Sequence, residues 1–260
     1  MVRSLGWAAA LLLMAGLPNS AAAQVRLEPL PQPQTARINV TYTEPSDEGQ
    51  AERLRDLAAR MKPTANQLEF LDRVDILIVH TPREFRQRLG RELKSFSAVS
   101  YVHGILFLSP LSWQRPPTEE ALRLEMEQAL VRYVANQLAG GNRLPDWLEN
   151  GLVAVLTRQP FALTTAEQVA RRAPLLLARF EEEDPAVGYW AVLYLVEERG
   201  GLGSVRQLLR LVAQRPDTFL ENLQLTYGVP AGQLERDWRQ WLQAKVEAEK
   251  EEREGPLIRR

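Results

Sequence analysis

The first half of the chain contains short runs with the residue pattern of β-strands. In these runs apolar and polar residues alternate, or β-branched and apolar residues cluster, and both patterns are typical of strands. Four segments show it: residues 38–42, 74–79, 98–102 and 105–108. The last two flank the dipeptide His103-Gly104, and two such runs around a dipeptide that contains glycine predict a β-hairpin.

Helical spacing and capping signals predict helices between these strands. Residues 48–62 carry apolar residues three and four positions apart, which predicts a helix that Pro63 interrupts. Residues 81–84 (TPRE) form a capping box with proline at the first helical position, and Gly90 is a natural end for the short helix that they open. We therefore expect residues 36–115 to form a small mixed sheet with helices on it.

The second half of the chain has helical spacing throughout. Thr118 caps a long helix that Gly140-Gly141 ends, and Pro145 opens the next helix. Cap signals or apolar stripes place further helices at Thr165, residues 189–196, Ser204, Asp217 and Pro230. The pattern predicts an α+β protein in which a small N-terminal mixed β-sheet with helices is followed by a mainly α-helical lobe over residues 116–244.

Both ends of the chain are predicted to lie outside this domain. An apolar run at residues 5–17 and an A-x-A pattern that ends at Ala23 indicate a cleaved signal peptide over residues 1–23. Residues 24–35 form a proline-rich extended arm, and residues 245–260 form a solvated, charged tail. Because no later segment is long and apolar enough to cross a bilayer, we expect an exported protein, periplasmic or extracellular, with no stable membrane span after cleavage.

Composition and motifs exclude several classes of chemistry. The chain has no cysteine, which excludes disulfides and thiol catalysis, so its hydrophobic core must stabilise the domain. Its formal net charge is −1, and nothing in this balance points to a nucleic-acid partner. The sequence also lacks the G-x-S-x-G motif of serine hydrolases, the phosphate-binding G-x-x-x-x-G-K-[ST] loop and the dinucleotide-binding G-x-G-x-x-G motif.

Two sequence patterns resemble one family of proteins. Within residues 121–156 a long helix and a glycine-rich turn lead into L-P-x-W-L-x-x-G-L-x-A, and residues 229–242 read V-P-x-x-x-L-E-x-x-W-x-x-W-L. Both patterns resemble peptidase MA-like domains of the gluzincin type, which are zinc peptidases whose active-site helix carries H-E-x-x-H. The resemblance implies a zincin-like arrangement over residues 36–244.

In the register of this resemblance, the metal-binding positions hold unsuitable residues. Leu124 and Gln128 take the two histidine positions, Asn150 takes the position of the third ligand, a glutamate, and Glu125 takes that of the general base. A catalytic zinc needs about three ligands from His, Cys or carboxylate groups. Leucine has no donor atom, and neutral amides are weak ligands for zinc. We therefore expect neither zinc nor another cofactor.

The two histidines of the chain, His80 and His103, do not replace the missing ligands. His80 ends an apolar strand run and His103 lies in the predicted hairpin turn, so we interpret both as structural residues.

Two classes of function fit these observations. The first is an exported, catalytically inactive pseudo-metallopeptidase that binds a polypeptide or acts as a scaffold in the envelope. The alternative is an active peptidase or other hydrolase with Glu125 as base and a non-standard metal site that recruits Glu127 or Glu149. We expect Glu149 to point away from Asn150, because one step along a helix turns the side chain by about 100°. A purely structural envelope protein without a cleft is a third hypothesis.

Overall fold

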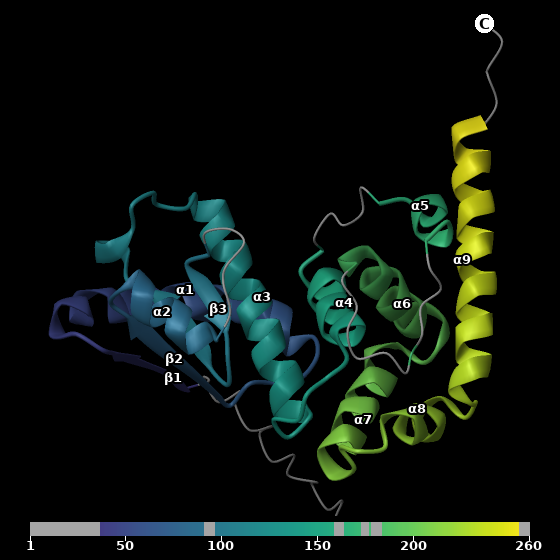
Figure 1. Cartoon of the computed structure of the whole chain (residues 1–260), viewed down its shortest axis with the longest axis horizontal. Coiled ribbons are helices and arrows are strands. Elements are labelled where there is room, and N and C mark those ends of the chain that lie inside the picture. The colour runs from purple at the N-terminus through teal and green to yellow at the C-terminus, as the bar shows by residue number, and fades with distance from the viewer. Residues whose placement is uncertain (1–36, 91–96, 159–163, 173–176, 178–183, 255–260) are drawn as a thin grey trace, which may run out of the picture. The chain divides into compact units, whose positions relative to one another are not determined.

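The computed structural model describes residues 37–90, 97–158, 164–172, 177 and 184–254. Within these ranges the chain forms nine α-helices and one four-stranded sheet (Figure 1). All of them belong to one compact unit, Thr35–Arg260. The prediction of an α+β protein with its strands in the first half and helices in the second is confirmed. The predicted signal peptide and proline-rich arm, residues 1–35, lie outside the described residues.

The sheet is mixed and has the strand order β1-β2-β4-β3. β1 (Arg37–Tyr42), β2 (Arg73–Val79) and β4 (Ile105–Leu108) are parallel, and β3 (Val99–Tyr101) pairs antiparallel with β4 at one edge. Each strand overlaps a run predicted from the sequence. The predicted hairpin is confirmed, and His103 lies in its turn with a φ of 51°.

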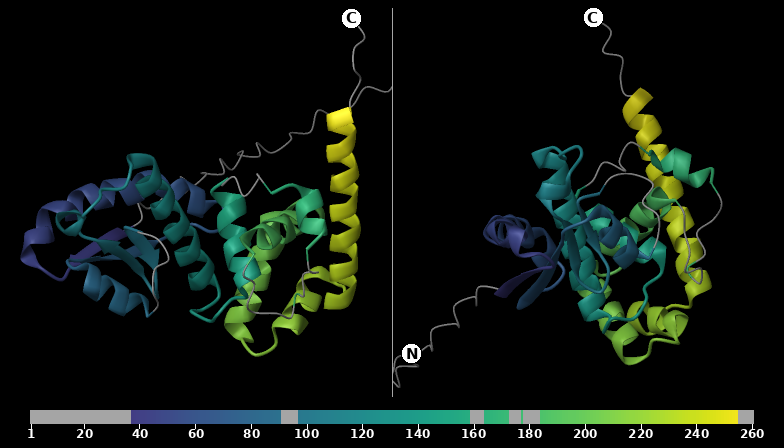
Figure 2. Two further views of the ribbon diagram at one scale, coloured as in Figure 1. Left: turned by 45° about the horizontal axis from the view of Figure 1, so that its top comes forward. Right: turned by 60° about the vertical axis from the view of Figure 1, so that its left-hand side comes forward.

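The two faces of the sheet contact different helices. One face contributes to the larger core cluster, together with α1 (Glu48–Asn66) and α3 (Glu119–Leu138). The other face packs against α2 (Pro82–Leu89), so α1 and α2 lie on opposite sides of the sheet (Figure 2). The alternation of strand side chains divides the residues accordingly: Ile76, Ile78 and Phe107 on the first face, and Val79, Leu106 and Leu108 on the second.

The prediction that Pro63 interrupts the first helix is wrong. α1 continues through Pro63 to Asn66. Proline removes one backbone donor and strains the preceding turn, but the last turn of α1 is held by tertiary contacts. Ala65 is fully buried, and the Thr64 hydroxyl donates a hydrogen bond of 3.1 Å to the Glu127 carboxylate on α3.

The predicted caps of α2 and α3 are confirmed. The Thr81 side chain accepts a hydrogen bond from the Glu84 amide, and Gly90 ends α2 in the left-handed conformation with a φ of 66°. The Thr118 side chain accepts a hydrogen bond of 3.1 Å from the Ala121 amide at the start of α3. Gly140 follows the end of α3 with a φ of 64°, a conformation that side chains with a Cβ rarely adopt.

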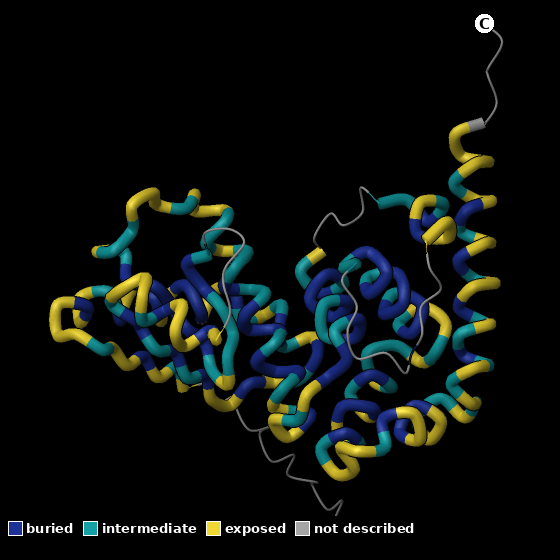
Figure 3. The backbone as a smooth tube through the Cα atoms, in the orientation of Figure 1, coloured by how far each residue is buried: buried dark blue, intermediate teal, exposed yellow. Residues whose placement is uncertain are grey.

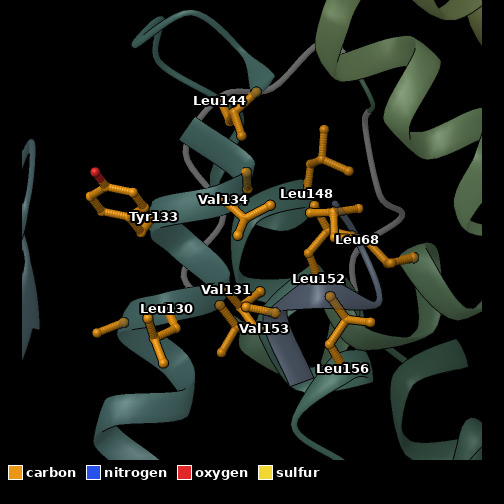
Figure 4. Close-up of a cluster of buried hydrophobic side chains, with 14 of the residues drawn as sticks. Leu68, Leu130, Val131, Tyr133, Val134, Leu144, Leu148, Leu152, Val153 and Leu156 are labelled. Carbon is orange, nitrogen blue, oxygen red and sulfur yellow. The ribbon is translucent and has the colours of Figure 1, made fainter. Parts of the chain in front are cut away.

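The helix after the glycine turn, α4 (Asp146–Leu156), packs against α3 and against α6 (Pro185–Glu198). Figure 4 shows the α3 and α4 side chains that meet in this core; among them are Val131, Val134, Leu148 and Leu152. On its other side α4 approaches α6 so closely that Gly151 and Gly188 lie at the crossing with backbone against backbone. The two helices with the resemblance motif are therefore a central part of the core.

The remaining helices are α5 (Ala166–Ala170), α7 (Gly201–Gln214), α8 (Phe219–Tyr227) and α9 (Ala231–Glu254). The cap of α5 is Thr165, as predicted, and the cap of α6 is Asp184. α7 begins at Gly201, three residues before the predicted start at Ser204, and α8 begins at Phe219 after an N-cap at Thr218 rather than Asp217.

The last helix extends into the segment predicted as a charged tail. α9 does not end near residue 245, because Val246 is only 3% exposed and belongs to the core. Farther along, the Glu249 carboxylate accepts a hydrogen bond of 3.0 Å from the Ala166 amide at the start of α5. Among residues 245–253 only Val246 is buried, and the others are half-buried or exposed. Exposed residues prevail toward this end of α9 (Figure 3). Residues 255–260 lie outside the described ranges.

Among the helices that the structure describes, none combines the length and the apolar character needed to cross a bilayer.

Candidate functional site

The candidate site lies where α3 runs beside the edge strand β3 and faces the start of α4. α3 contributes Leu124, Glu125 and Gln128, and one turn farther along it contributes Arg132. Residues four apart on a helix lie on the same side, so Leu124, Gln128 and Arg132 form one row along α3. Asn150 belongs to α4. All five side chains are half-buried.

Glu125, which the resemblance places at the general-base position, binds the backbone at the start of the edge strand. One of its carboxylate oxygens, Oε2, accepts hydrogen bonds from the backbone amides of Ala98 at 2.8 Å and Val99 at 3.0 Å. Burial raises the pKa of the Glu125 carboxyl, and the hydrogen bonds from the Val99 and Ala98 amides oppose this rise only in part. The carboxylate therefore fastens α3 to β3.

This contact uses backbone groups of β3 that point away from the sheet. In an antiparallel pair, alternate residues direct their N–H and C=O groups toward the partner strand. Leu108 donates to the Ala98 carbonyl and Val102 donates to the Gly104 carbonyl, so Val99 directs its backbone groups away from β4. The Val99 N–H donates to the Glu125 carboxylate, and the Ser97 hydroxyl donates to the Val99 C=O at 2.6 Å. At Val99 the free edge of the sheet is therefore closed by the protein itself.

Arg132 joins α3 to α4. Its Nη2 atom donates to the Asn150 Oδ1 atom at 2.9 Å, and its Nη1 atom lies 3.0 Å from a Glu149 carboxylate oxygen. Arginine is always protonated and its planar fork can serve two acceptors at once. Glu149 was expected to point away from Asn150, and the two side chains contact different nitrogen atoms of the same guanidinium group.

Two tyrosines border this cluster. Burial, with a smaller contribution from the Glu149 carboxylate, raises the pKa of the Tyr101 phenol to about 12. The Tyr101 and Tyr133 rings meet edge to face with centroids 6.3 Å apart, and the Tyr133 hydroxyl lies 3.4 Å from an Asp75 carboxylate oxygen. Tyr101 is therefore protonated at neutral pH.

The residues present do not fit a zinc ion. Leu124 has no donor atom, and Gln128 has no hydrogen-bond partner among the residues that the structure describes. Asn150 already accepts a hydrogen bond from a cation, Arg132, so its oxygen atom is engaged by positive charge. Within the described ranges, no group of three or more His, Cys, Asp or Glu side chains is arranged to hold a metal ion. The other carboxylate considered for such a site, Glu127, instead accepts a hydrogen bond from Thr64.

His80 belongs to a second polar cluster that the sequence interpretation missed. It follows β2 directly, and its Nδ1 atom lies 2.9 Å from a carboxylate oxygen of Asp47, whose side chain is fully buried. The Ser109 hydroxyl, which follows β4, donates to the other oxygen of the same carboxylate. The sequence indicated this cluster only weakly. Thr43, His80 and Ser109 each directly follow a strand, and the carboxyl ends of these parallel strands lie side by side. His103, by contrast, is an exposed turn residue.

We expect Glu125→Gln to leave the fold intact and to change its pH dependence. The amide oxygen of glutamine can accept the same two backbone hydrogen bonds without the cost of burying a charge. Because the folded-state pKa of Glu125 is raised, the folded state binds more protons than the unfolded state between the ordinary carboxyl pKa and the raised one, and wild-type stability falls as pH rises through this window. Urea unfolding at several pH values should show a stability difference that grows in favour of the variant as pH rises. A variant that unfolds more easily at every pH would contradict this account.

Comparisons of the chain with models of known protein families, with curated proteins and with solved structures find no match. The resemblance to peptidase MA-like domains therefore depends on the sequence motifs alone.

Proposed function

We propose that this chain is an exported, non-catalytic polypeptide-binding protein built on a zincin-like scaffold, a pseudo-metallopeptidase. The observation that carries the proposal is the guanidinium group of Arg132, which binds Asn150 and Glu149. A positive side chain thus lies beside the position where the resembling peptidases place their third metal ligand.

The arrangement of elements supports the scaffold part of this proposal. A mixed sheet ends in an antiparallel edge strand, β3, and the helix with the candidate general base runs beside that strand. A glycine turn then leads to α4, which supplies Asn150. This order matches the layout that the motifs imply, in which one helix supplies two ligands and the next helix supplies the third.

Electrostatics supports the non-catalytic part. A metal-activated water needs a cation with an open coordination position and a carboxylate free to take the proton. Here the Glu125 oxygen that would act as base accepts hydrogen bonds from two backbone amides. The side-chain oxygens of Asn150 and Glu149 on α4 are bound to Arg132. A bound metal would therefore have to displace an internal cation and a structural carboxylate contact.

The first test measures metal content and proteolysis together. The mature chain, purified without chelator, should contain no stoichiometric transition metal by elemental analysis. It should cleave an unstructured protein such as casein no faster than Glu125→Gln. Metal-dependent turnover that Glu125→Gln abolishes would refute the proposed function and establish the alternative of an active hydrolase.

A second test examines Arg132 directly by restoring the ligand set. The triple variant Leu124→His, Gln128→His, Asn150→Glu should bind zinc weakly, because Arg132 remains beside the restored site as a like charge. Adding Arg132→Ala should strengthen zinc binding by at least about tenfold, equivalent to about 1.4 kcal/mol. Titration with a competing zinc dye measures both variants, and Arg123→Ala, which removes an exposed arginine of the same helix, is the matched control. Equal zinc affinity with and without Arg132 would show that the guanidinium group does not replace the metal.

A further inference from the structure

A groove of about 560 Å³ lies between α1 and the segment that joins β4 to α3. Its base is apolar, since Leu54, Leu57 and Phe107 are each less than a tenth exposed. On the opposite wall Trp113 and Leu122 are half-buried, and both also pack against the core. The volume falls in the range of about 300–1,000 Å³ that is usual for binding pockets in proteins.

Trp113 is held in place as a rigid part of this groove. Its indole Nε1 atom donates a hydrogen bond of 2.9 Å to the Leu108 carbonyl. Its ring meets Phe107 at an interplanar angle of 60°, with centroids 6.0 Å apart. Tryptophan and arginine are enriched among the few residues that contribute most of the binding energy of protein interfaces. Nearby, Leu111 is 58% exposed, so apolar surface continues beyond the groove.

The rim of the groove carries a pattern of unpaired charges. Arg53, Asp56 and Arg60 line it from α1, and their spacing of three and then four residues places them in one row; Glu119 lines it from the start of α3. Their order of sign is positive, negative, positive. None of the three has an ion pair or hydrogen bond with another residue that the structure describes, although other exposed arginines of the chain, such as Arg88, are paired.

We propose that this groove binds an amphipathic helix of another polypeptide. The helix places apolar side chains against Trp113 and Leu122 and presents an acidic, a basic and an acidic side chain to Arg53, Asp56 and Arg60. The row on α1 spans about 10.5 Å, and a helix that lies alongside presents charges at the same spacing. This inference depends on the proposed polypeptide-binding function and names its site and the class of its partner.

The partner is identified by charge complementarity, so the test exchanges charges. The probe is a synthetic amphipathic helix of about four turns with leucines along one face and the flanking pattern Glu-x-x-Lys-x-x-x-Glu. A second peptide carries Lys-x-x-Glu-x-x-x-Lys, and a third replaces the leucines by serine. Fluorescence anisotropy of labelled peptides with the mature chain should show micromolar binding of the first peptide. Binding of the other two should be at least about tenfold weaker.

Variants of α1 decide whether binding occurs in the groove. Arg53→Glu combined with Arg60→Glu should weaken binding of the first peptide at least about tenfold. Arg55→Glu, an equal charge change at an exposed position of the same helix that does not line the groove, should leave it unchanged. The full reversal Arg53→Glu, Asp56→Lys, Arg60→Glu should prefer the second peptide. Circular dichroism confirms that each variant is folded, as expected for exposed positions.

Each outcome separates this inference from the proposed function. If the affinity for the peptides depends neither on their charge pattern nor on the α1 substitutions, the groove is not the binding site. The inference then fails, even when the chain is metal-free and inactive as the proposed function expects. Self-association that Arg53→Glu with Arg60→Glu abolishes would also overturn it, because the occupant would then be a second copy. Metal-dependent proteolysis would refute the proposed function whatever the peptides do.

Discussion

Gly151→Ala is expected to destabilise the protein by about 3 kcal/mol or more, because it overpacks the crossing of α4 and α6, where backbone lies against backbone. A Cβ atom at this position would lie 2.2 Å from the Gly188 carbonyl oxygen and 2.5 Å from a methyl group of Val192. The first of these atoms is backbone, so a rotamer change cannot relieve the clash, and α4 and α6 would have to separate. Urea unfolding followed by circular dichroism measures the loss.

A matched control exists in α1. Gly49 lies near the start of this helix, and a Cβ atom there meets nothing within 4 Å. Gly49→Ala should therefore be neutral or stabilising by up to about 1 kcal/mol, since alanine favours helix and restricts the unfolded chain. If Gly151→Ala costs less than about 1 kcal/mol, the close approach of α4 and α6 is not present in solution. The glycine of the L-P-x-W-L-x-x-G-L motif is thus explained by packing and needs no catalytic role.

Asp47→Ala should have the second large effect, a loss of about 1–3 kcal/mol, which is the cost of leaving buried polar groups without partners. The Asp47 side chain is fully buried, and its two carboxylate oxygens serve the Ser109 hydroxyl and the His80 ring. The substitution removes the acceptor for both groups and leaves polar atoms without partners at the ends of β2 and β4. Unfolding in urea at neutral pH measures the change, and Ser46→Ala, at an exposed neighbouring position, should cost less than about 0.5 kcal/mol.

A double-mutant cycle separates the pair from the general cost of truncation. Asp47→Ala, His80→Ala and the combined variant should give non-additive losses, because once either partner is absent the other has less to lose. The interaction between the two side chains should be at least about 0.5 kcal/mol. Additive losses of unfolding free energy would mean that Asp47 and His80 stabilise the fold independently and that the contact between their side chains contributes nothing.

Much of the local structure was predictable because its causes are local. The strand β2 follows from the β-branched run after Arg73, and the cap of α3 follows from Thr118 and the amide three residues later. The hairpin turn at His103-Gly104 likewise depends on adjacent residues. Local signals were misleading where tertiary contacts outweighed them. At Pro63 the buried Ala65 and the contact between Thr64 and Glu127 hold a turn that proline alone would disfavour.

The candidate site shows the same division more sharply. Leu124 has no donor atom and the amides of Gln128 and Asn150 are weak ligands for zinc, and these are properties of residue types that need no coordinates. No periodicity, however, indicated that Arg132 would reach Asn150 and Glu149, since that contact joins two helices across a turn. The same holds for Asp47, which lies 33 residues before His80 and 62 before Ser109.

The sequence by itself thus determined where most strands and helices form and which side chains stand at positions 124, 128 and 150, because propensity, capping and donor atoms are properties of short stretches and single side chains. Only the tertiary structure decided what surrounds these positions: a guanidinium group between α3 and α4, and a carboxylate that binds the backbone at the start of β3. The physical reason is that burial and pairing of charges depend on which distant segments pack together, and the folded chain alone brings these groups within hydrogen-bond distance.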